Sequence, residues 1–163
     1  MTEYTLADLT KIVGAKRRSV QLWAEAGVIQ ADPLTERAGT GVARRFGWDE
    51  AVIACIIHAF AIRQVSIGHL LKLSGGLRTR LRRHEVRESI KSALRPSVDA
   101  AYLIIAEAEG KLQQICLYPR LRDQRDGTLW SNIGEAAAPD LLTKAADGMT
   151  FTIDMKVYLR NLK

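Results

Sequence analysis

Cysteine, histidine and aromatic residues are scarce in this sequence. Its 163 residues include two cysteines and three histidines, and only 6% are aromatic. Cys55 and Cys116 lie in apolar surroundings and form no disulfide framework, so we expect a reduced chain in the cytoplasm. Cys55 and His58 have the spacing of half a metal site, but no second pair of ligands lies nearby. We therefore expect a buried thiol and a hydrogen-bonded histidine, with no metal and no cofactor.

Long apolar runs and catalytic motifs are missing as well. The longest apolar run, 51–62, is interrupted by His58 and is too short to cross a bilayer, and no cationic leader precedes an apolar segment at the start. The sequence has no phosphate-binding glycine loop, no paired-carboxylate signature and no nucleophile elbow. We therefore expect no membrane association, no catalytic residues and no enzymatic activity.

Positive charge is in excess, and it is unevenly distributed. The formal net charge is +6; residues 1–95 carry 16 Lys and Arg against 9 Asp and Glu, whereas residues 96–163 carry 8 against 9. A cationic first half joined to a nearly neutral second half favours a polyanion-binding module linked to a second domain. With 47% apolar residues, the chain is long enough for one or two small domains.

Two short helices are predicted at the start of the chain. Apolar residues fall on helical spacing over 6–13, and Thr5 with Asp8 predicts a capping box before them. A glycine follows this helix. A second helix is predicted over 17–26, where Gly27 can take the left-handed conformation that ends it. Two short helices around a tight glycine turn form a helix-turn-helix, whose second helix can enter the DNA major groove.

The second helix has two unlike sides. Plotted at 100° per residue, one side is apolar and is expected to pack, and the other is polar and free, with Arg17 and Leu22 at its borders. The apolar side consists of Val20, Trp23 and Ala24, and the polar side of Arg18, Gln21 and Glu25.

A basic loop and a core helix are predicted next. The segment 30–47 has no helical period, and we expect a loop or a short hairpin in which Arg44 and Arg45 form a basic wing. The segment 48–62 is apolar nearly all round, so it predicts a core helix, with Phe46 and the two nearby tryptophans also in the core. A shorter fourth helix is predicted from a cap at Ser66 to the glycine pair at 75–76.

The most basic stretch comes next, over 77–95. Its cations recur every three or four residues and predict one side of a single helix that ends at Pro96. This side could follow the DNA backbone, meet an acidic partner, or be a solvated surface, and the sequence leaves the three open. The cations in question are Arg80, Arg83, Arg87, Lys91 and Arg95.

The pattern after Pro96 predicts a small α+β domain. The runs AYLIIAEA (101–108) and KLQQICLY (111–118) are strand-like and flank a hairpin turn at Glu109-Gly110. A helix over 138–146, a strand over TFTID (150–154) and a short terminal helix from Met155 to Leu162 complete the prediction. The expected domains are a mainly α winged helix-turn-helix domain (1–76), a basic connecting helix (77–96) and an α+β domain (97–163) that dimerises or binds an effector or a partner.

Four segments of the first half match one family pattern in order and at nearly the right distances. They are YTLADLTKIVG (4–14), GAKRRSVQLWAEAGVI (14–29), GVARRFGWDEAV (41–52) and VSIGHLL (65–71). Over about residues 4–73 the chain thereby resembles the MerR family of bacterial transcription regulators. The family's winged helix begins Tyr-Thr-Ile/Leu and continues Gly-Val-Ser-Pro-Arg-Thr-Leu-Arg-Tyr-Tyr-Glu. The wing and the Phe-Ser-Leu turn of the family match the last two segments.

The resemblance implies which residues touch DNA. It aligns Arg18 with the recognition-helix arginine of the family, Ser19 with its threonine, and Arg44 and Arg45 with its wing arginines. The chain also departs from the family. Lys16 replaces the N-cap serine, and a cap so poor costs the helix about 1 kcal/mol.

Three further departures are present. Arg17 replaces the proline at the first helical position, and Leu22 stands where a tyrosine would contact phosphate. The long dimerisation coiled coil is missing because the candidate helix stops at Pro96. Cys55 and Cys116 do not form the metal-binding loop of the metal-sensing members.

The sequence therefore predicts a dimeric, sequence-specific DNA-binding regulator of bacterial or phage type, in the nucleoid of the cytoplasm. The expected partner is double-stranded DNA carrying an inverted repeat, and the expected DNA-binding residues are Lys16, Arg17, Arg18, Ser19, Gln21, Arg44 and Arg45. Two alternatives stay open. One is an architectural or excisionase-like recombination accessory protein that bends or coats DNA. The other uses the second half to bind a protein, for example RNA polymerase.

Overall fold

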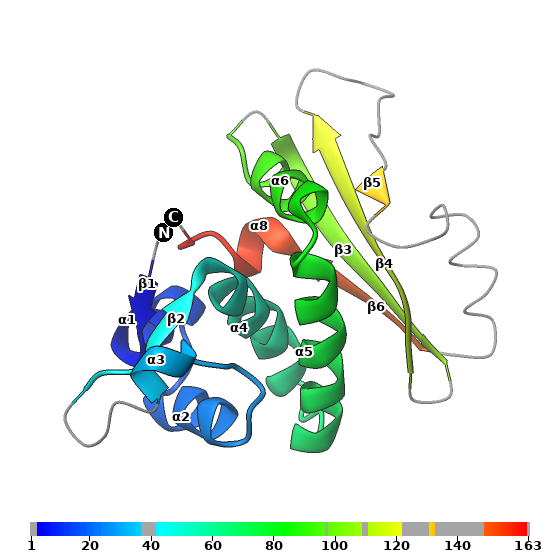
Figure 1. Cartoon of the computed structure of the whole chain (residues 1–163). Coiled ribbons are helices and arrows are strands. Elements are labelled where there is room, and N and C mark those ends of the chain that lie inside the picture. The colour runs from blue at the N-terminus through cyan, green and yellow to red at the C-terminus, as the bar shows by residue number, and fades with distance from the viewer. Residues whose placement is uncertain are drawn as a thin grey trace. The chain divides into compact units, whose positions relative to one another are not determined.

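A computed structural model describes residues 3–36, 42–96, 98–108, 111–121, 131–132 and 149–162. This part of the chain is mainly helical and contains a two-stranded and a four-stranded sheet (Figure 1). The chain divides into two compact units, Met1–Arg78 with Asn161–Lys163, and Thr79–Arg160. The division falls two residues beyond the boundary expected at 76, and the last three residues belong to the first unit.

The first unit begins with strand β1 (Glu3–Thr5) and helix α1 (Leu6–Val13). Thr5 is the N-cap of α1: its Oγ1 accepts a hydrogen bond from the backbone N of Asp8 at 3.2 Å, and its own backbone N donates to Asp8 Oδ2 at 2.9 Å. Gly14 ends the helix with a φ of 71°. The predicted capping box and helix end are both confirmed.

Helix α2 (Arg17–Glu25) ends in a Schellman motif. The backbone N of Val28 donates to the carbonyl oxygen of Trp23 at 2.8 Å, and that of Gly27 donates to Ala24 at 3.2 Å. Gly27 has a φ of 74°, a left-handed conformation that other residues adopt at a cost. The prediction that this glycine ends the second helix is therefore confirmed.

The segment expected as a loop or hairpin contains a short helix and a strand. Helix α3 covers Pro33–Glu36, and strand β2 (Arg45–Gly47) pairs with β1 instead of with a neighbouring strand of its own hairpin. The pairing is antiparallel, with Tyr4 opposite Phe46. Residues 37–41 of the expected wing lie outside the described part of the chain.

Helix α4 (Trp48–Ala61) is the core of the first unit, as predicted. Its side chains from Ala51 to Ile57 are at most 1% exposed. Trp23 and Phe46 are also buried, at 3% and 0% exposure, whereas the other tryptophan expected in the core, Trp48, is only half-buried.

Helix α5 (Ile67–Leu81) starts as predicted but does not end at the glycine pair. Ser66 Oγ accepts a hydrogen bond from the backbone N of His69 at 3.4 Å. The helix continues through positions 75 and 76 because Leu73, Leu77 and Leu81 repeat every four residues and are all at most 4% exposed. Their burial outweighs the helix propensity of two glycines, about 1 kcal/mol each.

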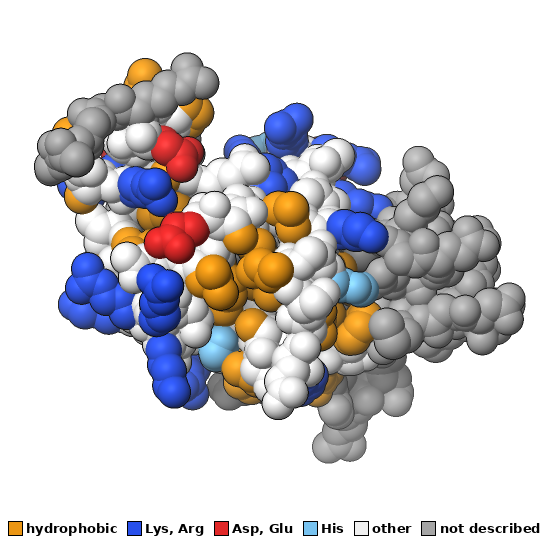
Figure 2. Space-filling view, turned by 90° about the horizontal axis from the view of Figure 1, so that it is seen from below, with side chains coloured by type: hydrophobic (Ala, Val, Ile, Leu, Met, Phe, Trp, Pro, Cys, Tyr) orange, Lys and Arg blue, Asp and Glu red, His pale blue; other side chains and the backbone are white. Residues whose placement is uncertain are grey.

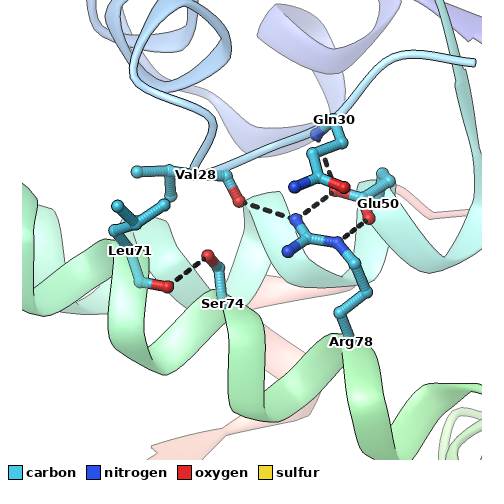
Figure 3. A network of polar contacts seen from close by, with 6 residues as sticks. All are labelled: Val28, Gln30, Glu50, Leu71, Ser74 and Arg78. Atoms are coloured by element: carbon cyan, nitrogen blue, oxygen red, sulfur yellow. Dashed lines mark hydrogen bonds and ion pairs between the residues drawn. The ribbon is translucent and has the colours of Figure 1, made fainter. Parts of the chain in front are cut away.

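An ion pair joins three segments of the first unit (Figure 3). Arg78 of α5 donates from Nε to Glu50 Oε1 at 2.6 Å and from Nη2 to Glu50 Oε2 at 3.0 Å. The same Nη2 donates to the carbonyl oxygen of Val28 at 3.0 Å, and Glu50 Oε2 accepts from the backbone N of Gln30 at 2.9 Å. The network therefore connects α4 and α5 with the backbone that follows α2.

The second unit contains an antiparallel sheet of order β5-β4-β3-β6. The strands are β3 (Val98–Ala108), β4 (Lys111–Leu121), β5 (Ser131–Asn132) and β6 (Met149–Asp154), and helix α8 (Met155–Tyr158) follows. The three predicted strands are confirmed, and the terminal helix is shorter than predicted. The expected turn at 109–110 and the expected helix at 138–146 lie outside the described residues.

The prediction of a single basic helix over 77–96 is wrong, because these residues belong to two helices. Helix α5 ends at Leu81, and α6 (His84–Ala93) begins after Arg83. The side chains of Val86 and Ile90 on α6 are at most 4% exposed, and α6 contacts β3 and β4. Helix α6 thus packs on the sheet with its own apolar stripe.

No helix in the described ranges is long and apolar enough to cross a membrane.

Replacing Glu50 by Gln should lower the free energy of unfolding by about 2–4 kcal/mol, because Arg78 would keep a mostly buried charge without a counter-charge. The side chains of Arg78 and Glu50 are only 16% and 12% exposed. Chemical denaturation of the full chain measures the loss. Glu88→Gln is the matched control: Glu88 pairs with Lys91 at 2.9 Å on the surface, and its loss should leave the denaturation midpoint nearly unchanged. Equal effects of the two substitutions would contradict the importance of the Glu50 pair.

Candidate nucleic-acid interface

One side of α2 is free of contacts with the core. Val20 and Trp23 are 0% and 3% exposed, whereas Arg18 and Glu25 are exposed on the opposite side. Leu22 is 47% exposed and lies on this free side, while Gln21, expected there, is half-buried. At 100° per residue, Leu22 lies closer to Arg18 around the helix than Gln21 does. The sequence alone therefore indicates that Leu22 belongs to the free side. The free side thus consists of Arg18, Leu22 and Glu25.

The start of α2 concentrates positive charge. Lys16 is the N-cap residue with φ −65° and ψ 137°, and its side chain makes no capping hydrogen bond. Lys16, Arg17 and Arg18 are all exposed, and the first turn has no acidic residue. Within the part of the chain that the structure describes, none of these three side chains makes a hydrogen bond or ion pair. Ser19 is half-buried, and its backbone N donates to the carbonyl oxygen of Lys16 at 2.9 Å.

This charge opposes the dipole of α2. The N-terminal end of a helix is positive, so each cation there is unfavourable by about 0.3–1 kcal/mol at low salt. The free backbone N–H groups at the same end attract anions. A phosphate at this position would compensate the cations and use the free donors together.

Arg45 is held by backbone contacts on both sides. It lies opposite Thr5 in the β1–β2 pair, its backbone N donates to Thr35 Oγ1 at 3.0 Å, and its carbonyl oxygen accepts from the backbone N of Asp32 at 2.7 Å. These contacts leave the Arg45 side chain exposed. Arg44, just before the strand, is exposed as well.

The carboxylate of Asp8 interacts electrostatically with Arg45. Hydrogen bonds from Thr5 lower the pKa of Asp8, and the positive charges of Lys11 and Arg45 lower it further. Asp8 therefore stays ionised at neutral pH and offsets part of the charge of Arg45.

The other expected cations do not form a continuous stripe. Arg80 is half-buried on α5, and Arg83 precedes α6 and binds Glu85 Oε1 through Nε at 2.8 Å. Arg87 is half-buried on α6, and Lys91 binds Glu88 at 2.9 Å. The expectation that these cations share one side of one helix is wrong because the helix breaks after Leu81.

Cys55 is a core residue, and His58 is half-buried beside Trp23. Cys55 is buried, and burial raises the pKa of its thiol to about 12. Burial lowers the pKa of His58, whose ring lies 6.2 Å from that of Trp23 at an interplanar angle of 52°. Among the described residues no group of three potential metal ligands comes together.

Figure 2 shows one face of the molecule from below. On its left, where Figure 1 places α2 and α3, Lys and Arg side chains project beside acidic ones. Hydrophobic side chains gather next to them, towards the middle of the face. Charged and apolar groups are therefore exposed close together on this part of the surface.

No family model matches the chain, and no curated protein matches it in sequence. Its function must therefore be argued from the geometry of its own residues.

Replacing Lys16 by Ser should stabilise the fold, since Ser can accept a hydrogen bond from the free N–H groups at the start of α2 and removes one unfavourable charge. The expected gain is about 1 kcal/mol in the free energy of unfolding, measured by chemical denaturation. Lys72→Ser, at an exposed position within α5, is the control and should not stabilise. A loss of stability in Lys16→Ser would contradict the conclusion that α2 starts without a cap at Lys16.

Cys55 should resist alkylation in the native protein. With a pKa of about 12 the thiol is protonated at pH 8, and the thiolate is the reactive form. Iodoacetamide labelling followed by peptide mass spectrometry should find Cys55 unmodified in the folded chain and modified in denaturant. Rapid modification of the folded protein at pH 8 would show that the thiol is accessible and ionised.

Proposed function

We propose that the protein is a sequence-specific DNA-binding regulator that inserts α2 into the major groove. The observation that carries the proposal is the start of α2, where three exposed cations without acidic partners surround an uncapped helix end. Phosphate is the anion that the DNA surface presents in greatest number, and helix N-termini are common phosphate contacts. Lys16 and Arg17 would bind phosphates, and Arg18 would reach base edges.

The first unit would then be a winged helix-turn-helix of the MerR type. The support is local: the capping box at Thr5, the left-handed Gly14 between α1 and α2, and the Schellman motif at Gly27. Strand β2 delivers Arg44 and Arg45 as exposed cations directly before the core helix α4. In this proposal they contact the DNA backbone next to the groove that holds α2.

The proposal includes a dimer. A single short helix reads few base pairs, and most readers of this kind bind as two-fold dimers on inverted repeats with half-sites about one or two helical turns apart. The second unit would provide the dimer contact. Sedimentation of the free protein and of its DNA complex measures the stoichiometry.

Arg18→Ala should weaken binding to the preferred duplex by about 1–3 kcal/mol and should affect random duplexes much less, because a bidentate contact to guanine would be lost. The preferred duplex comes from selection of bound sequences from random DNA by the full chain, and affinities follow from fluorescence anisotropy at fixed salt. The matched control is Arg160→Ala, which removes an exposed arginine of the second unit and should change neither affinity.

Two outcomes would change the assignment. If Arg18→Ala weakens every duplex equally and lowers the slope of log affinity against log salt by about 0.9, Arg18 binds phosphate and does not read a base. If selection enriches no sequence while the protein still coats DNA cooperatively, an architectural or excisionase-like role replaces the regulatory one.

A further inference from the structure

The free side of α2 carries an apolar side chain between charged ones. Leu22 is 47% exposed and follows Arg18 by four residues, which places the two Cβ atoms about 6 Å apart on one helix face. Glu25 is exposed on the same face. Single exposed leucines are common on proteins. The exposure of Leu22 is informative only because charged residues lie beside it on the same face.

These neighbours restrict what the face can contact on DNA. Neither an isobutyl group nor the carboxylate of Glu25 binds a phosphate favourably, whereas Lys16 and Arg17 at the helix start do. A DNA contact through α2 therefore places phosphates at its N-terminal end and base edges against the side that holds Leu22. The apolar group that base pairs present in the major groove is the C5-methyl of thymine.

We propose that Leu22 contacts the C5-methyl group of a thymine in the major groove, one or two base pairs from the base that Arg18 contacts. The spacing follows from the separation of the two side chains, about 6 Å, and the rise of about 3.4 Å per base pair. This inference rests on the proposed function and goes beyond it by naming a base and an atom. It makes Leu22 a specificity-determining residue.

The test uses uracil, which pairs as thymine does and keeps the O4 acceptor but lacks the methyl group. Each thymine of the selected duplex is replaced by uracil in turn, and affinities are measured for the full chain and for Leu22→Ala. One thymine per half-site should show binding about three- to fivefold weaker with uracil, as expected for one buried methyl group. In Leu22→Ala the thymine and uracil duplexes should bind equally at that position. Alanine is a strong helix former, so α2 should be preserved.

Leu71→Ala is the matched control. Leu71 is 45% exposed on α5, and its Cδ1 lies 3.9 Å from the position that a Cβ on Gly27 would occupy. This variant should keep the full preference for thymine over uracil. If both leucine variants instead lower protein association and leave the thymine preference intact, Leu22 belongs to a protein contact and the inference is wrong.

The remaining outcomes separate the two proposals. Specific binding with no thymine that is sensitive to uracil overturns the role of Leu22 and leaves the DNA-binding function in place. Failure of the unmodified chain to bind any duplex overturns both.

Discussion

The ion pair between Glu50 and Arg78 is the contact on which the rest of the first unit depends. It fixes the start of α4 against α5, and through Val28 and Gln30 it holds the backbone that leaves α2. Both charges are mostly buried, so each relies on the other for compensation. The core helix, the long helix and the exit from the proposed reading helix are therefore coupled through one guanidinium and one carboxylate.

The features that the sequence predicts well are those decided by neighbouring residues. Thr5 and Asp8 lie three residues apart and cap each other, and Gly14 and Gly27 end helices because they adopt left-handed conformations at little cost. The start of α2, on which the candidate site depends most, is also decided by neighbouring residues. The three consecutive cations Lys16, Arg17 and Arg18 predict the uncapped helix start from the sequence alone.

The features that the sequence does not predict are those decided by distant contacts. The glycine pair at 75–76 has a local preference to end a helix, but buried leucines on both sides keep α5 continuous. The partner of β2 is a strand about 40 residues earlier, which no local pattern identifies. The break between α5 and α6 exists because α6 packs on a sheet formed by later residues. The helical angle placed Leu22 at the border of the free side, and the structure exposes it there.

The short pairing of β1 with β2 makes the basic segment sensitive to chain length. Along β2, the exposed Arg45 and the fully buried Phe46 alternate, and Thr5 and Tyr4 lie opposite them. Because side chains of a strand alternate between its two faces, deleting Gly47 would move Arg45 into the position of Phe46, and Phe46 into that of Gly47. The aromatic ring would then lose its fully buried position, and a guanidinium would enter the core. The burial of Phe46 therefore fixes how many residues can lie between Arg45 and the core helix α4.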